Sequence, residues 1–272
     1  MSAGRAADLD RIAAALSAAG EVLQAFTPGA IAASRKAGGS PVTEADRAVD
    51  DVLRRALPRA GEGWLSEETA DSPDRLHRER VWVVDPLDGT KEFVEGLPEW
   101  CVSVGLVENG EAVAGGILSP ATGQLFLGSR ETGVLLNGAP TGLSVHRELA
   151  GAKVLASRSE VRRGEWAKFE GAGFEIQALG SVALKLALVA SGLAEASWTL
   201  VPKNEWDLAG GVALLAAAGG VARTPAGRPA RFNRPRTLYP GLIVCPPPLE
   251  AAIDRVIAER HGAFDERDFD HN

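Results

Sequence analysis

A series of five short apolar segments between residues 81 and 136 constrains the fold of this chain more than any other feature. Each segment has the length and composition of a β-strand, and Gly, Pro and Asn lie at the turns between them. Asn109-Gly110, between the second and third segments, is a strong signal for a tight hairpin. We therefore expect an antiparallel sheet with strands at residues 81–84, 101–108, 112–118, 124–129 and 134–136.

Helical patterns lie on both sides of this sheet in the sequence. Apolar residues recur at helical spacing in residues 7–26 and 43–57, and Thr43 has the character of an N-cap. After residue 150, short strands alternate with helices. The first half therefore predicts helices packed on an antiparallel sheet, and the second half a smaller α/β layer. The later elements are expected at residues 153–157, 181–191, 208–218 and 249–260.

Length and composition fit one large domain or two closely packed ones. The chain has 272 residues, of which 45% are hydrophobic and 24% charged, as in an ordinary globular protein. We divide it into an N-terminal α+β domain, residues 1–150, and a C-terminal α/β domain, residues 151–272. Residues 35–40 are expected to form a mobile loop, and residues 264–272 a frayed tail.

The first strand-like segment ends in two carboxylates at a turn. Asp85 and Asp88 follow the apolar run, and Gly89 and Thr90 close the turn. Carboxylates and backbone carbonyls that converge at one exposed point suit a hard divalent cation such as Mg²⁺. If a helix begins here, the N–H groups of Gly89 and Thr90 would be available to an anion. The alternative is an ordinary turn, because Asp, Pro and Gly are favoured in turns without any chemistry.

Acidic residues in three other segments lie where an element begins or ends. Glu67 and Glu68 follow a short apolar pair at the end of a strand-like segment. Asp207 opens an alanine-rich helical run, and Asp46 lies in the first turn of the second expected helix but outside its apolar stripe. Taken alone, Asp207 reads as a helix cap and Asp46 as part of a solvated helix face.

Together, these segments resemble the inositol monophosphatase superfamily of magnesium-dependent, lithium-sensitive phosphomonoesterases. That family is marked by an upstream Asp, a Glu-Glu pair, the motif D-P-[IL]-D-G-[TS], and a W-D pair that precedes G-G. Here the motifs read Asp46, Glu67-Glu68, residues 85–90, and Trp206-Asp207 followed by Gly219-Gly220. The resemblance implies an α/β (α+β) fold, a five-layered αβαβα sandwich of the sugar-phosphatase type, with the active site between the halves.

The resemblance also implies two to three Mg²⁺ ions in one site. Glu67 and Asp85 would share the first ion with the main-chain carbonyl of Leu87. Asp85, Asp88 and Asp207 would hold the second ion, and Glu67 with water a weaker third. Metal ions in such a site neutralise the phosphoryl oxygens, lower the pKa of water and stabilise the leaving oxygen.

For catalysis, the resemblance implies that Thr90, polarised by Asp46, orients the attacking water. Glu67 belongs to the same catalytic set. Backbone N–H groups around the turn would hold the transferred phosphate. The substrate contacts expected by resemblance are Gly89, Thr90, Ser181, Lys185 and Asp207.

Residues around these motifs indicate which phosphate ester is cleaved. Simple inositol monophosphatases usually continue as D-G-T-T-N-F, whereas Lys91-Glu92-Phe93 looks like the 3′(2′),5′-bisphosphate nucleotidase branch. Gly180-Ser181 followed by Lys185 resembles a segment of that branch, and Thr199-Leu200 stands where the inositol enzymes carry a glutamate. We expect 3′-phosphoadenosine 5′-phosphate as substrate, with Lys185 or Lys203 at its second phosphate. The alternative for Lys185 and Lys203 is that both are solvated surface charges. The alternative substrates are inositol 1-phosphate and fructose 1,6-bisphosphate.

Charge and composition bear on the partners. The formal net charge of −7 argues against a nucleic-acid polymer, and no apolar run approaches the roughly 18–20 residues of a membrane span. Cys101 and Cys245 lie in apolar surroundings and the N-terminus has no signal-peptide pattern, which favours a cytoplasmic location. We expect a small phosphate monoester as partner and, by resemblance, a homodimer. A non-catalytic regulatory relative would be expected to lack a ligand or the Thr90 and Asp46 pair, and all of these are present.

Overall fold

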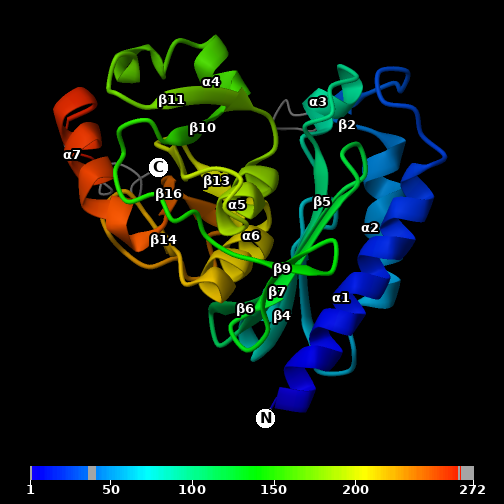
Figure 1. Cartoon of the computed structure of the whole chain (residues 1–272). Coiled ribbons are helices and arrows are strands. Elements are labelled where there is room, and N and C mark those ends of the chain that lie inside the picture. Colours follow the sequence, from blue (N-terminus) through cyan, green and yellow to red (C-terminus); the bar gives the residue numbers. More distant parts are fainter. Residues whose placement is uncertain (1, 36–40, 263, 265–272) are drawn as a thin grey trace.

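The computed structural model describes residues 2–35, 41–262 and 264, which form five layers (Figure 1). Two helices cover the outer face of a seven-stranded sheet, two more lie between this sheet and a five-stranded sheet, and the last two lie beyond the second sheet. These layers confirm the expected αβαβα sandwich. In layer order the helices are α1 (Ser2–Leu23) and α2 (Glu44–Ala56), α5 (Val182–Ala190) and α6 (Glu205–Ala218), and α4 (Arg158–Arg162) and α7 (Glu250–Arg260).

The seven-stranded sheet contains all five strands that the sequence predicted. Its strands lie in chain order, and every neighbouring pair is antiparallel except the first, which is parallel. Asn109 and Gly110 both have positive φ, 49° and 80°, as a two-residue hairpin turn requires. The strands are β3 (Gly63–Ser66), β4 (Arg80–Asp88), β5 (Cys101–Glu108), β6 (Glu111–Ser119), β7 (Gln124–Ser129), β8 (Gly133–Leu136) and β9 (Ala139–Thr141).

The five-stranded sheet is mixed and is built from the second half of the chain. Its order is β11-β10-β12-β16-β14, with parallel pairs on either side of β10 and antiparallel pairs on either side of β16. Its strands are β10 (Lys153–Ser157), β11 (Glu175–Leu179), β12 (Ala196–Thr199), β14 (Val221–Arg223) and β16 (Leu242–Cys245). Two small ladders join β1 (Ser34–Arg35) with β2 (Pro41–Val42), and β13 (Lys203–Asn204) with β15 (Leu238–Tyr239). The remaining short helices are α3 (Thr90–Val94), η1 (Pro73–His77), η2 (Ala167–Phe169) and η3 (Pro247–Leu249).

Helix α6 lies in the middle layer because its composition lets it be buried on all sides. It contains mostly Ala, Leu and Gly, and its centre is buried. Glycines bring it close to the larger sheet: a Cβ on Gly105 would lie 2.7 Å from the carbonyl carbon of Ala209, and one on Gly115 would lie 2.3 Å from the carbonyl oxygen of Gly210. This close contact sets the position of the first turn of α6, which carries Asp207.

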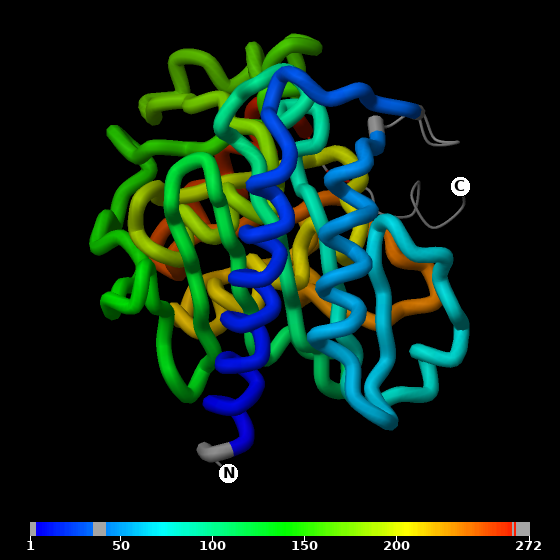
Figure 2. Tube along the Cα trace, turned by 90° about the vertical axis from the view of Figure 1, so that its right-hand side faces the viewer, coloured from blue at the N-terminus to red at the C-terminus, as the bar shows by residue number. Residues whose placement is uncertain are grey.

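The helix predictions are confirmed with small shifts at the ends. Figure 2 shows α1 and α2 side by side over the larger sheet. Helix α1 begins and ends earlier than the expected 7–26, and α6 begins three residues before the expected 208. Most of the expected loop at 35–40 and of the tail at 264–272 lies outside the described residues. Among the described helices, none is both long and apolar enough to cross a membrane.

The two sheets come from opposite sides of residue 150, where the sequence predicted a boundary. Buried side chains of α5 and α6, such as Leu186 and Leu208, share one core with strands of both sheets, such as Val83 and Val244. The division into two domains therefore stays a prediction. Cys101 and Cys245 are buried free thiols, as expected.

Candidate active site

A β-bulge at the end of β4 turns two aspartates toward the middle layer. Asp85 is paired with Ser103 and Asp88 with Cys101, so β4 advances three residues while β5 advances two. In a regular strand, residues three apart point to opposite faces, but the extra residue of a bulge reverses this. Both carboxylates consequently face α5 and α6.

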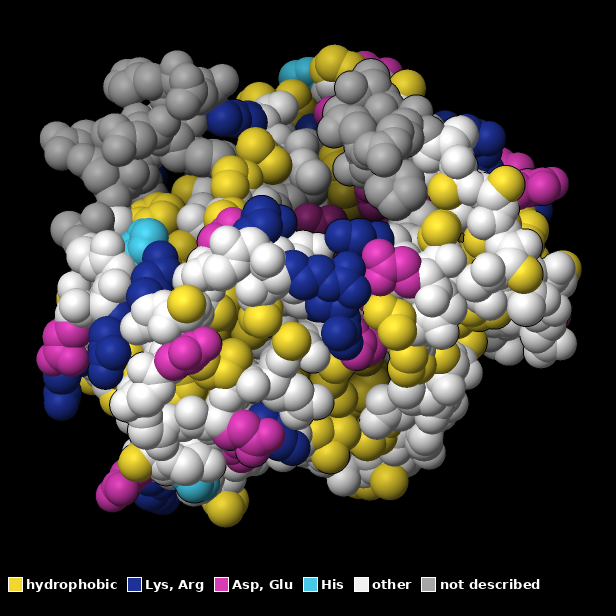
Figure 3. All heavy atoms as spheres, turned by 90° about the horizontal axis from the view of Figure 1, so that it is seen from above, with side chains coloured by type: hydrophobic (Ala, Val, Ile, Leu, Met, Phe, Trp, Pro, Cys, Tyr) yellow, Lys and Arg dark blue, Asp and Glu magenta, His cyan; other side chains and the backbone are white. Residues whose placement is uncertain are grey.

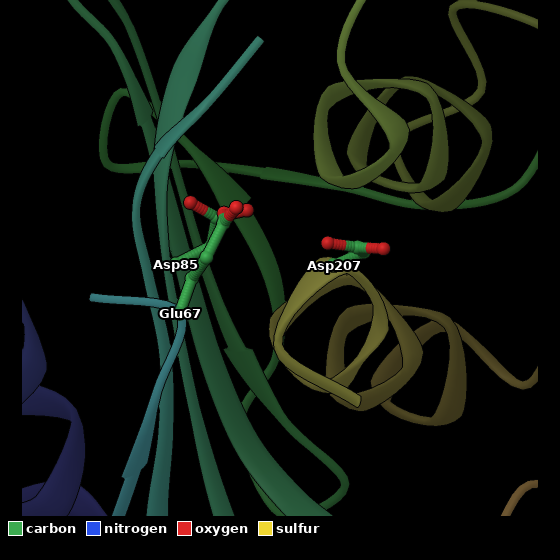
Figure 4. Close-up of side chains that lie close together, drawn as sticks. All are labelled: Glu67, Asp85 and Asp207. Atoms are coloured by element: carbon green, nitrogen blue, oxygen red, sulfur yellow. The ribbon is translucent and has the colours of Figure 1, made fainter. Parts of the chain in front are cut away.

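Three of the expected metal ligands converge from three distant segments. One carboxylate oxygen from each of Glu67, Asp85 and Asp207 lies within 4.8 Å of the others. Figure 4 shows Glu67 and Asp85 together at the end of the larger sheet, with Asp207 facing them from the first turn of α6. We call these three residues the carboxylate cluster.

Electrostatics in the carboxylate cluster are unfavourable without a cation. Burial raises the pKa of Asp85 well above its usual range, and the charges of Glu67, Asp88 and Asp207 raise it further. Burial, with Asp88 and Glu67, raises the pKa of Asp207 to about 8. A donor set made of carboxylate oxygens suits a hard cation, which removes the repulsion. The residues present therefore fit the Mg²⁺ that the motifs imply.

Asp88 lies beside the cluster and is tied to α5. Its Oδ2 accepts hydrogen bonds from Ser181 Oγ and from the backbone N–H of Ala183, both at 2.6 Å. Burial raises the pKa of Asp88, while the bond from Ser181 and the charge of Lys185 act in the opposite direction. These bonds leave Oδ1 for a metal ion. The hydroxyl of Ser181, which was expected to contact substrate, thus holds in place a residue that was expected to be a metal ligand.

Thr90 and Asp46 meet as the motifs predict. Thr90 Oγ1 lies 2.8 Å from Asp46 Oδ1, to which it donates, and 3.0 Å from the carbonyl oxygen of Leu87. Asp46 Oδ2 accepts from the backbone N–H and the hydroxyl of Thr43, at 2.8 and 2.6 Å. Asp46 is 1% exposed. The reading of Asp46 as part of a solvated helix face is therefore wrong.

Asp207 has the same position in its helix as Asp46 has in α2. Each is the third residue of the helix, and each accepts the backbone N–H of the N-cap residue at 2.8 Å, Thr43 in one case and Asn204 in the other. The cap fixes one oxygen and leaves the second to point into the site. Capping and ligation therefore do not exclude each other, because each uses a different oxygen.

Two glycines next to the motifs are required by space. Gly89 has φ of 99°, and a Cβ there would lie 2.7 Å from the carbonyl oxygen of Glu99. A Cβ on Gly180 would lie 2.4 Å from Cγ of Glu92. The Glu92 side chain, which distinguishes this chain from D-G-T-T-N-F relatives, thus packs directly on the turn before Ser181.

Lys185 is buried rather than solvated. Its ammonium group donates to the carbonyl oxygens of Leu179, Gly180 and Ser181 at 3.3, 3.3 and 2.6 Å. Burial lowers its pKa to about 8, against the raising influence of Asp88. The surface alternative is therefore wrong for Lys185. An ammonium has three N–H donors, and carbonyl oxygens accept from all three here. This geometry does not favour the predicted contact between Lys185 and a second phosphate.

Sequence reasoning missed a buried glutamate near position 199. Glu160, in α4, accepts hydrogen bonds from the hydroxyl of Thr199 at 2.6 Å and from Trp166 Nε1 at 3.1 Å. Lys203 Nζ lies 3.2 Å from the same carboxylate. Glu160 belongs to no motif and lies outside every landmark segment, so only its place in the fold reveals it.

A second missed contact joins the two halves beside the site. Glu99 accepts from Arg158 Nε at 2.8 Å and from the backbone N–H of Gly180 at 2.7 Å. Arg162 forms a further ion pair with Glu95. The face seen from above carries basic and acidic side chains next to each other near its middle (Figure 3).

Comparisons with known proteins agree with this geometry. The model of the inositol monophosphatase family matches residues 7–263. An inositol-1-monophosphatase from Mesorhizobium japonicum is 34% identical over 200 residues, which cover 69% of this chain and 73% of the relative. The structure of the extragenic suppressor protein suhB from Bartonella henselae has a TM-score of 0.78 at 26% identity and covers 92% of this chain and 98% of its own. CysQ from Bacteroides thetaiotaomicron, described as a bacterial member of that family, has a TM-score of 0.72 at 28% identity and covers 88% of this chain and 97% of its own.

Proposed function

The chain belongs to the inositol monophosphatase family, whose members are magnesium-dependent phosphatases of phosphate monoesters, and on this premise we propose that it removes the 3′-phosphate of 3′-phosphoadenosine 5′-phosphate. The observation that carries the reaction type is the convergence of Glu67, Asp85 and Asp207 beside the hydrogen-bonded pair of Thr90 and Asp46. Two to three Mg²⁺ ions are proposed for this site, and lithium is proposed as an inhibitor.

Each residue of the site has a role that follows from its contacts. When bound, Mg²⁺ neutralises the phosphoryl oxygens and makes a nearby water more acidic. The hydroxyl of Thr90 donates its proton to Asp46, so its oxygen is free to accept a hydrogen bond from the attacking water and to orient it. Asp88, fixed by Ser181, completes the ligand set. Backbone N–H groups at Gly89 and Thr90 are proposed to hold the phosphate.

The choice of substrate is supported by what lies at position 199. Thr199 occupies the place where the inositol enzymes carry a glutamate for sugar hydroxyls, and its own hydroxyl is bonded to Glu160. The Glu160 carboxylate is also engaged by Lys203 and Trp166. This leaves no uncommitted carboxylate at that point for a polyol. Lys203 retains donors beyond its one ion pair and is the better candidate for a second phosphate than Lys185.

A second candidate is inositol 1-phosphate. The Mesorhizobium relative named inositol-1-monophosphatase, at 34% identity, supports this alternative. Fructose 1,6-bisphosphate is a third. A cytoplasmic location and a homodimer also remain proposals.

The test is a phosphate-release assay with Mg²⁺ on these three substrates. We expect the highest kcat/KM for 3′-phosphoadenosine 5′-phosphate. A higher kcat/KM for inositol 1-phosphate would show that the substitutions at Lys91-Glu92 and Thr199 do not set specificity, and the second candidate would replace the first.

The contact with the second phosphate is tested by Lys203→Ala. Loss of one charge-assisted contact should lower kcat/KM for the bisphosphate about tenfold or more, with little change for inositol 1-phosphate. Lys153→Ala is the control, because Lys153 lies at the start of β10 and its ammonium donates to the carbonyl oxygen of Leu193, at 3.5 Å, rather than to Glu160. Equal losses on both substrates would instead mean that Lys203 acts only by holding Glu160.

A further inference from the structure

A short segment of the second half carries an unusual concentration of positive charge. Residues 223–236 contain five arginines and no acidic residue, in a chain whose net charge is −7. They are Arg223, Arg228, Arg231, Arg234 and Arg236. Three prolines in the same segment limit its flexibility. The proposed phosphatase reaction uses none of these residues.

The fold gathers four of these arginines around one hollow. A cavity of about 550 Å³ is lined by Arg228, Arg231, Arg234 and Arg236, with Leu238, Tyr239 and three prolines among the other lining residues. Among the residues that the structure describes, none that lines it is acidic. Arg223 points elsewhere, to Glu250 and Asp254. The size lies within the range of small-molecule sites in proteins.

The segment that forms the hollow is fixed to the rest of the protein. Arg75, in η1 and 2% exposed, donates to the side chain of Asn233 at 2.9 Å and to the carbonyl oxygen of Arg234 at 3.0 Å. The fully buried Glu205 accepts the backbone N–H groups of Asn233 and Arg234 at 2.7 and 3.0 Å. Figure 2 shows this segment, in orange, beside the cyan part of the chain that contains η1. The hollow is therefore formed before any ligand arrives.

The arginines differ in how firmly they are held. The guanidinium of Arg234 lies 4.0 Å from the ring centre of Tyr239 and donates to Glu205 and to the carbonyl oxygen of Leu238. Arg231 forms an ion pair with Glu111 in which both side chains are about half exposed, and such pairs are weak. Arg228 and Arg236 also have interactions within the chain. An anion would therefore compete most easily for the guanidinium of Arg231.

We propose that this hollow binds a small molecule with two linked phosphate groups. Planar guanidinium groups bind phosphate oxygens in pairs, and several arginines around one hollow match three or four negative charges. The prolines and Leu238 offer an apolar wall for an organic body. The hollow is distinct from the carboxylate cluster, whose charge has the opposite sign. The hollow borders the β13–β15 ladder and Glu205. Glu205 precedes Asp207 of the carboxylate cluster by two residues in α6.

The experiment uses the full-length protein, stripped of metal with a chelator and then desalted. Without metal, the carboxylate cluster repels anions, so calorimetric binding of pyrophosphate reports a site elsewhere. We expect saturable binding of one pyrophosphate per chain, at least tenfold tighter than inorganic phosphate, which weakens as salt rises. Adenosine diphosphate is the second arm: tighter binding than pyrophosphate indicates a nucleotide ligand, and equal binding indicates recognition of the phosphates alone. Absence of saturable pyrophosphate binding overturns the proposal.

The site is located with the double variant Arg228→Ala/Arg231→Ala. It should bind pyrophosphate at least tenfold more weakly than the wild type. Arg163→Ala is the matched control, because Arg163 is as exposed as Arg231, 53% against 54%, and, among the described residues, each forms an ion pair with one glutamate. The melting temperature and the Mg²⁺-dependent phosphatase activity of all variants should stay near wild type. An equal loss of binding in Arg163→Ala would mean that the binding is non-specific, and the proposal would fail even if the phosphatase assignment held.

Discussion

The two oxygens of Asp46 have separate partners. Oδ2 closes the first turn of α2 by accepting two hydrogen bonds from Thr43, and Oδ1 accepts the hydroxyl of Thr90. Replacing Asp46 would therefore disturb a helix cap and the site together. Thr90 offers a cleaner test of the chemistry, because its hydroxyl bonds, within the described part of the chain, to Asp46 Oδ1 and the Leu87 carbonyl alone.

Thr90→Ala should lower kcat about a hundredfold, within the range for groups that act by positioned proton interactions, while Mg²⁺ affinity stays near wild type. Asp85→Asn should instead abolish Mg²⁺ binding, because it removes a carboxylate of the cluster. Thr90→Ser keeps the hydroxyl and should keep most of the activity. Calorimetric Mg²⁺ titration and steady-state kinetics on all three variants provide the measurement. A loss of Mg²⁺ affinity in Thr90→Ala as large as in Asp85→Asn would refute the separation of roles.

At the scale of elements, the position of Asp207 depends on how closely α6 packs on the larger sheet. Gly105 and Gly115 on the sheet face Ala209 and Gly210 on the helix, and no side chain fits between them. The helix is thereby brought near enough for Asp207 to reach Asp85 and Glu67. Small residues that bind no metal thus determine the geometry of the site.

Gly115→Ala should consequently weaken both folding and metal binding. The added methyl would lie 2.3 Å from the carbonyl oxygen of Gly210, so α6 must shift. Overpacking of this kind costs about 1–3 kcal/mol of unfolding free energy, measurable by urea unfolding, and the shift should also lower Mg²⁺ affinity. Gly142→Ala is the control, because no atom lies within 4 Å of its added methyl and its φ is not positive. If Mg²⁺ affinity were unchanged while stability fell, α6 packing would not control the site.

At the scale of the whole molecule, the site lies between the first turn of α6 and the ends of strands in the larger sheet (Figure 4). The helix and the sheet come from different halves of the chain. The like charges of Glu67, Asp85, Asp88 and Asp207 oppose this assembly. A raised carboxyl pKa means that the folded state binds more protons than the unfolded state, so stability falls as pH rises through that interval. Without metal, the carboxyls with raised pKa values therefore favour the folded state most where they are protonated.

This predicts a pH-dependent effect of Mg²⁺ on melting temperature. The unfolded pKa of an aspartate is about 4, and the folded pKa of Asp207 is about 8. The stabilising contribution of the protonated group is complete below about pH 4 and is lost as pH rises toward 8. Metal-free protein should thus melt at a lower temperature at about pH 8 than at about pH 5.5, and the increase produced by Mg²⁺ should be larger at the higher pH. Asp207→Asn cannot titrate there and should reduce the pH dependence; a metal-free melting temperature that rises with pH would contradict the prediction.

Much of this protein could be predicted from short stretches of sequence. The strands of the larger sheet, the Asn109-Gly110 turn and the Thr43 cap of α2 depend on neighbouring residues, and local patterns predict them well. The N-cap of α6 is Asn204, which the sequence did not predict. The motifs around Glu67, Asp85 and Asp207 identified the family and the acidic site because their order and spacing are preserved. Element ends shifted by a few residues, as at α1, because tertiary contacts decide where a helix stops.

Contacts between distant residues were decided only by the tertiary structure. A bulge places Asp85 and Asp88 on one side of β4. Pro86 is a local signal compatible with a bulge, but only the pairing of β4 with β5 shows which residues it displaces. Only the folded structure shows that Asp46 is buried, that the Lys185 ammonium donates to three carbonyl oxygens, and that Glu160 pairs with Lys203. The sequence by itself determined which residue types carry the chemistry. The packing of α6 between the two sheets decided which of these acidic residues lie close together. Burial and pairing of side chains depend on contacts between residues far apart in the chain.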